Sequence, residues 1–227
     1  MKRKEKRDIL LSMLLGDGCL AYSSNRISAG ITLGHCASQK DYLEFKVNFL
    51  QKAFDSKINI RHMLRETSYQ ASFHRKRFKA WRKFIYKDNK KDISKILPFI
   101  INPERALSFW LMDDGYVEPS ITKNKHGQKY LASARLRLFT CDQSLETHEH
   151  IVEWFYKNFD CRPKIAYSWH NKQKKHYPYL KFSTKDSIQI WEKIREFCLI
   201  VPSMSHKFRH IEEIYQKKLL QRTTEVK

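Results

Sequence analysis

Two apolar segments of this chain each end in an aspartate followed by a glycine. Residues 10–18 read LLSMLLGDG, and residues 107–115 read LSFWLMDDG. Carboxylates at the negative end of a helix are disfavoured, and adjacent acids also repel each other. A divalent metal held by oxygen ligands would offset that cost. We therefore expect Asp17 and Asp114 to take part in metal chemistry.

The two segments align at an offset of 97 residues, which places Asp17 on Asp114. One such nonamer could be an ordinary helix end, but two copies half a chain apart favour a shared role. Their apolar side chains cover every face of a short helix, so each helix should be buried on several sides. Small residues would let the two helices approach closely, and the candidates are Ser12, Gly16 and Ser108. Acids paired beside metal ions suit phosphodiester hydrolysis, in which metals stabilise the attacking water and the leaving oxygen.

The segments around the motifs alternate between strand and helix patterns, and the second half repeats the order of the first. In the first half we expect strands near 26–33, 57–65 and 68–74, and helices over 38–54 and 75–86. In the second half we expect strands near 129–140, 164–170 and 179–183, and helices over 144–159, 185–199 and 203–220. Pro103 is suited to the first position of the second motif helix. The sequence predicts an α+β fold of two αββαββα half-domains, residues 1–97 and 98–227, related by a pseudo-twofold axis.

Charge and composition indicate a nucleic-acid partner. The chain carries 44 Lys and Arg against 24 Asp and Glu, a net charge of +20 over 227 residues. This net charge is larger than solubility requires, and its like charges repel one another, so we expect a polyanionic partner. The basic residues are spread along the chain among aromatic residues, which favours nucleic acid over a membrane surface as that partner. Five cysteines without a CxxC pair indicate reduced thiols in an intracellular compartment and no cysteine-bound zinc. No segment is long enough to cross a membrane.

The paired nonamers and the repeated halves resemble the LAGLIDADG homing endonucleases, in particular the single-chain type with two motifs. The resemblance implies that the acid before the last glycine of each motif is catalytic and binds Mg²⁺, for which Mn²⁺ or Ca²⁺ can substitute in binding. These acids are Asp17 and Asp114. The resemblance also implies that the backbone carbonyls of Gly16 and Asp113 complete the metal shell.

The resemblance further implies one lysine near the active site in each half. The matching segments are DNKKDI, which gives Lys91, and PSMSHKF, which gives Lys207; Lys90 is an alternative to Lys91. A lysine there could order water or neutralise charge on the phosphate. The motifs also differ, because Phe109 stands at the position of the small Ser12. We expect the helices to cross asymmetrically, so the two DNA strands need not be cut at equal rates.

The function implied is a monomeric, pseudo-dimeric endonuclease that cuts both strands of a long asymmetric DNA site of roughly 20 base pairs. An intron RNA-splicing maturase, or a DNA-binding protein without cleavage, on the same scaffold is the alternative. The enzyme is favoured over these alternatives by the presence of the two acids and two lysines, which are Asp17, Asp114, Lys91 and Lys207. In this fold, saddle-shaped antiparallel sheets enter the major groove, where outward side chains contact bases and phosphates. The DNA-contact candidates are Arg26, Asn59, Arg61, Arg65, Gln70, Ser72, His74, Lys123, Lys125, Gln128, Lys129, Arg135, Arg137, Lys164, Tyr167, Lys181 and, near a hairpin tip, Trp169 and His170.

Overall fold

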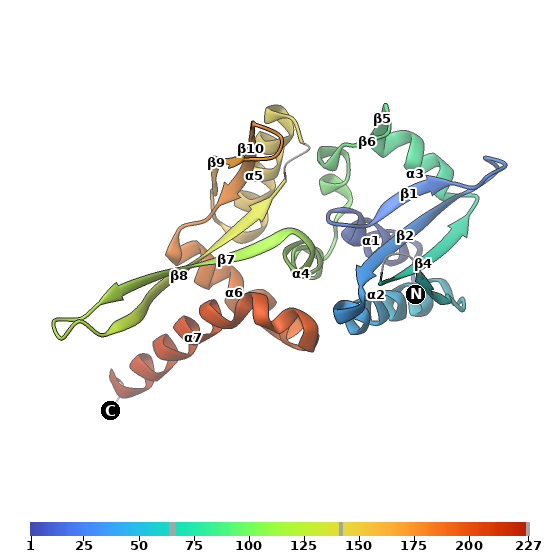
Figure 1. Ribbon diagram of the computed structural model, residues 1–227. Helices are drawn as coiled ribbons and strands as arrows, with labels where there is room; N and C mark the ends of the chain where they lie inside the picture. Colours follow the sequence, from blue (N-terminus) through green and yellow to red (C-terminus); the bar gives the residue numbers. More distant parts are fainter. Residues whose placement is uncertain (64–66, 141–142, 226–227) are drawn as a thin grey trace. The chain divides into compact units, whose positions relative to one another are not determined.

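The computed structural model describes residues 1–63, 67–140 and 143–225, which form two compact units (Figure 1). The first unit contains residues 1–113 and 201–204, and the second contains residues 114–200 and 205–227. The predicted half-domains 1–97 and 98–227 describe the internal repeat and stay a prediction. None of the helices in the described ranges is both long and apolar enough to span a lipid bilayer.

The first unit is a four-stranded antiparallel sheet with helices. Its order is α1 (Arg3–Leu14), β1 (Cys19–Tyr22), β2 (Ala29–Cys36), η1 (Ala37–Gln39), α2 (Lys40–Phe54), β3 (Ile60–Met63), β4 (Ser68–Arg75), α3 (Phe78–Ile85), β5 (Tyr86–Lys87), β6 (Lys90–Lys91), η2 (Ile93–Lys95), η3 (Leu97–Phe99) and α4 (Pro103–Asp114). The sheet order is β1-β2-β4-β3, and β5 with β6 forms a separate two-stranded hairpin.

The second unit repeats this arrangement. Its elements are β7 (Gly115–Lys123), β8 (Lys129–Phe139), α5 (Leu145–Phe159), β9 (Lys164–His170), β10 (Lys175–Lys181), α6 (Thr184–Leu199) and α7 (Pro202–Glu225). The sheet order β7-β8-β10-β9 matches that of the first unit strand for strand. Ser144 and Ser183 cap the N-termini of α5 and α6 by accepting backbone N–H groups. The predicted αββαββα order and the antiparallel sheets are confirmed.

Each sheet has one buried face, as period-two alternation requires. In β2 the buried side chains are those of Ala29, Ile31, Leu33 and His35, and in β8 they are those of Ala134, Leu136 and Leu138. Helices α2 and α3 pack against the first sheet, and α6 packs against β8. The opposite face of each sheet carries mostly polar side chains.

Two predicted strands begin later than expected. We predicted a strand from residue 26, but β2 begins at Ala29 because Arg26 lies in a turn with a positive φ of 54°. Ile27, which falls within the predicted strand but precedes β2, is 58% exposed. Strand β3 begins at Ile60, so Asn59 lies in the preceding loop rather than on a strand. The prediction for Arg65 falls outside the residues that the structure describes.

Candidate metal and nucleic-acid site

Helices α1 and α4, which carry the two motifs, contact each other at repeat-related positions within the first unit. The buried Asp8 of α1 forms an ion pair with the partly exposed Arg105 of α4, and these residues are 97 positions apart, as the motifs are. Asp8 also accepts the Ile101 N–H at 2.5 Å. Because a buried carboxylate is costly unless it is paired and hydrogen-bonded, these contacts fix the start of α4 against α1.

At the other end of this helix pair, Gly16 lies against Asp113, again 97 positions away. A methyl group added at Gly16 would come within 2.5 Å of the Asp113 Cβ and closer still to Oδ2. The backbone N–H of Asp17 donates to Asp113 Oδ2 at 3.0 Å. The side chain of one motif therefore fills the space left by the glycine of the other.

We expect Gly16→Ala to lower the free energy of unfolding by about 1–3 kcal/mol, the usual cost of overpacking a filled site. Urea unfolding of the purified variant measures this change. The matched control is Gly34→Ala, because a methyl group there would find its nearest neighbour, the Tyr69 carbonyl oxygen, at 3.9 Å. Equal stability of the two variants would contradict the close contact at Gly16.

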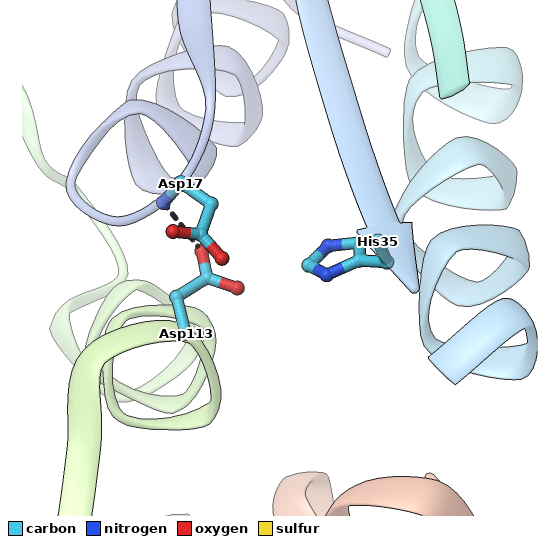
Figure 2. Close-up of side chains that lie close together, drawn as sticks. All are labelled: Asp17, His35 and Asp113. Carbon is cyan, nitrogen blue, oxygen red and sulfur yellow. Dashed lines mark hydrogen bonds between the residues drawn. The ribbon is translucent and has the colours of Figure 1, made fainter. Parts of the chain in front are cut away.

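Three potential metal ligands converge at the ends of the motif helices. Asp17, His35 and Asp113 each offer a ligand atom, and these atoms lie within 4.8 Å of one another. Figure 2 shows the two carboxylates side by side, with the His35 ring on β2 facing them. Asp17 is exposed, whereas His35 is only 6% exposed. An exposed carboxylate fits a hard divalent cation such as Mg²⁺, which prefers oxygen ligands and keeps several waters.

Two residues of this cluster, His35 and Lys46, were not predicted from the sequence. Lys46 of α2 is fully buried, and its Nζ lies 2.6 Å from Asp113 Oδ1 and 3.2 Å from His35 Nε2. The sequence did contain a signal, because Lys46 lies four residues after Tyr42 and four before Leu50, on the apolar stripe of the helix. Lysines are almost never fully buried without a partner, so this position required one.

Lys91 reaches the end of α1 from the β5–β6 hairpin. Its Nζ donates to the carbonyls of Gly16 and Gly18, at 2.5 and 3.0 Å, on either side of Asp17. The hairpin pairs Lys91 with Tyr86, whose hydroxyl accepts the Leu20 N–H at 2.9 Å. Burial raises the pKa of Tyr86, so the hydroxyl stays neutral. Gly16 and Gly18 directly follow the C-terminus of α1, where a positive charge is favourable.

The comparison with protein families decides the identity of this fold. Residues 7–190 match the family model described as the LAGLIDADG DNA endonuclease family. The chain belongs to the LAGLIDADG DNA endonuclease family. The matched range contains most of α1, all of α4 and every strand of both sheets.

Two solved structures resemble most of the chain in fold. The homing endonuclease I-WcaI bound to its DNA recognition sequence has a TM-score of 0.64 at 21% identity, covering 90% of this chain and 85% of I-WcaI. I-DmoI in complex with DNA and Mn has a TM-score of 0.52 at 18% identity, covering 84% of this chain and 96% of I-DmoI. At these identities the likeness shows the fold. No curated protein matches the chain.

Asp114 and Lys207, the other two predicted catalytic residues of this LAGLIDADG chain, lie in the second unit. Asp114 is the last residue of α4 and follows Asp113 directly; its side chain is partly exposed. Lys207 lies in the second turn of α7 and is also partly exposed. Lys90, the alternative to Lys91, is exposed on β6.

The open face of the first sheet carries most of the DNA-contact residues predicted for this unit. Arg61 pairs with Gln70 across β3 and β4, so both side chains share the face that also carries Ser72 and His74. The His74 ring lies across Gly30 of β2, where it occupies the position that a side chain would take. Arg26 is exposed in the β1–β2 turn. The predicted set thus covers one sheet face and its adjoining turn.

In the second sheet, Arg135, Arg137, Lys164 and Lys181 share the open face. Arg137 is partly constrained there, since its Nε donates to Glu118 Oε2 at 3.0 Å and its guanidinium lies over the Tyr179 ring.

The other predicted DNA-contact residues of the second sheet lie on the two faces of β9 and in the β7–β8 hairpin. His170 follows Lys164 by six residues and shares its face, whereas Tyr167 and Trp169 lie on the opposite face of β9 because strand side chains alternate. That Tyr167 contacts DNA stays a prediction. The predicted residues of the β7–β8 hairpin are all exposed, and they are Lys123, Lys125, Gln128 and Lys129.

Proposed function

We propose that this LAGLIDADG chain is a homing endonuclease that cuts both strands of a long, asymmetric DNA site of about 20 base pairs in the presence of Mg²⁺. The observation that carries the proposal is the arrangement at the end of α1. There the exposed Asp17 lies between two carbonyls held by Lys91, and its N–H is held by Asp113. A protein that only binds DNA has no need of this costly group of buried and paired charges.

We assign the metal to the Asp17 carboxylate. Because Asp114 occupies the same position in the second motif, we assign metal binding to its carboxylate as well. When bound, the metal supplies positive charge that stabilises the attacking water and the leaving oxygen of the phosphodiester. Mn²⁺ is present in the I-DmoI complex with DNA, which supports a divalent ion of this size. The carbonyl of Gly16 accepts from Lys91, so this oxygen already has a cationic partner.

The lysines and the sheets complete the proposed activity. Lys91 brings a positive charge to within hydrogen-bonding distance of the residues that flank Asp17, where it can offset charge on a bound phosphate. We propose the same role for Lys207. The basic and polar residues of the two open sheet faces bind the duplex, with base edges read in the major groove.

The direct test is incubation of the purified chain with duplex DNA that joins the sequences flanking its own reading frame. We expect Mg²⁺-dependent double-strand cleavage within the joined sequence and complete inhibition by EDTA. Tight, specific binding without cleavage under any divalent metal would instead indicate the cleavage-inactive binding protein. Specific binding of intron RNA in place of the duplex would indicate the maturase.

Lys91 offers a test of the site with a matched neighbour. We expect Lys91→Ala to lower the single-turnover cleavage rate by about 10²-fold, the scale of losing one group that stabilises developing charge. Lys90→Ala, on the exposed strand position before it, should cut at the wild-type rate. Quenched-flow cleavage of a labelled duplex measures both. A larger loss in Lys90→Ala would move the role to Lys90.

A further inference from the structure

Lys46 is a fully buried charged group beside the proposed metal site, and neither the repeat nor the motif accounts for it. Its side chain has 0% exposure, as does that of its partner Asp113. We propose that Lys46 is a built-in cation that occupies the place of a metal ion at Asp113 and His35. In doing so it makes Asp113 a positioning residue for Asp17.

The first step of the argument is that the same ligand atoms cannot serve both cations. Asp17, His35 and Asp113 form a group that by distance alone could hold a metal. Lys46 Nζ, however, lies 2.6 Å from Asp113 Oδ1 and 3.2 Å from His35 Nε2. A divalent ion bound to these atoms would lie next to an ammonium group in a buried site, where like charges repel strongly. Lys46 therefore excludes a metal from the inner part of this group.

The second step is that Asp113 transmits the position of Lys46 to Asp17. One oxygen of Asp113 contacts Lys46, and the other accepts the Asp17 backbone N–H at 3.0 Å. Lys46 is itself held by α2, where its Nζ lies 4.3 Å from the centre of the Tyr42 ring. The Tyr42 hydroxyl donates to the carbonyl of Phe109, one turn before Asp113 in α4. The chain of contacts thus runs from α2 through α4 to the backbone of Asp17.

The third step is that the repeat-related positions do not carry these residue types. The endings KAFD and KNFD of α2 and α5 align at an offset of 105 residues, which places Ile151 at the position of Lys46 and Thr140 at that of His35. Asp113 likewise corresponds to Gly16 in the other motif. The contact is therefore not a consequence of the duplicated fold, because an ordinary helix face at this position takes an apolar residue.

Titration of the DNA-free protein with Co²⁺ tests the proposal, with visible absorption as the readout. We expect Lys46→Ala to bind Co²⁺ at least about tenfold more tightly than the wild type, because the variant releases Asp113 and His35 as ligands. His35→Ala added to Lys46→Ala should abolish the gain. In the wild type, His35→Ala should leave Co²⁺ affinity unchanged. Equal affinities of Lys46→Ala and wild type, or a wild-type affinity that depends on His35, would overturn the proposal.

A second experiment compares two double variants and can be done even if Lys46→Ala fails to fold. Unlike the Co²⁺ titration, this experiment rests on the proposed nuclease activity. The double variants Lys46→Met/Asp113→Asn and Lys46→Met/Asp113→Leu both remove the buried charges, but only the asparagine variant keeps a side-chain oxygen for the Asp17 N–H. We expect the leucine variant to cut about tenfold more slowly than the asparagine variant, with equal DNA affinity in Ca²⁺. Equal cutting rates would indicate that Asp113 does not position Asp17 and contributes only to packing. A chain that cuts no DNA at all would fail this comparison and leave the Co²⁺ result standing.

Discussion

Asp17→Asn is expected to lower the rate of double-strand cleavage by about 10³-fold or more, the upper range for removing one charge-stabilising group from an active site. The amide keeps the size of the side chain but removes the negative charge that a divalent cation requires. The side chain is exposed at the end of α1, so the fold should not change. DNA affinity measured in Ca²⁺ should change by less than about threefold, because the phosphate contacts that dominate affinity come from elsewhere.

The matched control for this prediction is Asp55→Asn. Asp55 is also an exposed aspartate at the end of a helix, in the left-handed conformation with φ 47° that asparagine tolerates. This variant should cut at the wild-type rate. Cleavage by Asp17→Asn at more than a tenth of the wild-type rate would contradict the assignment of Asp17, and a similar loss in both variants would indicate a nonspecific effect of charge removal.

The second large expected effect is the salt dependence of DNA binding. The chain carries a net charge of +20, and the open face of the second sheet carries Arg135, Arg137, Lys164 and Lys181. Each phosphate that a lysine or arginine neutralises releases a counterion, so log Kd should rise linearly with log salt. For six to ten phosphate contacts we expect affinity to fall by about 10³-fold or more between 50 and 200 mM salt. Fluorescence anisotropy with a labelled duplex measures this slope.

One exposed lysine, Lys125, tests how much a single phosphate contact contributes to the salt dependence of DNA binding. Lys125→Ala, in the exposed β7–β8 hairpin, should weaken binding similarly on all sequences and reduce the slope by about one counterion. A flat salt titration of the wild type would contradict the proposal that the basic sheet faces bind the phosphate backbone. A steep wild-type slope that Lys125→Ala leaves unchanged would place the hairpin outside the bound region.

The repeated order of helices and strands could be predicted because its signals are local. The apolar motif helices and the alternation of β8 depend on residues close in sequence, and both are observed. Errors arose where alternation was extended too far. Arg26 and Ile27 continue the pattern of β2 but lie in a turn, because the positive φ of Arg26 cannot be recognised from side-chain polarity.

The composition of the candidate site was harder to predict, because it depends on contacts between distant segments. Asp113 was expected to contribute a backbone carbonyl, whereas the structure directs its side chain to Lys46 and to the Asp17 N–H. His35 lies near the end of β2, 18 residues after Asp17, and no local pattern connects the two. Lys46 could have been recognised as a charge within an apolar stripe, but its partner could not have been named.

The central claim is that metal binds at Asp17 and Asp114, the last acid of each motif, whereas at Asp113 the ammonium group of Lys46 occupies the position of a metal ion. Anomalous diffraction from crystals of the protein with its DNA site and Mn²⁺ tests this most directly. The account predicts manganese peaks on the carboxylates of Asp17 and Asp114, and the Lys46 ammonium beside Asp113. A manganese peak coordinated by Asp113 and His35, or the absence of manganese from Asp17, would contradict it.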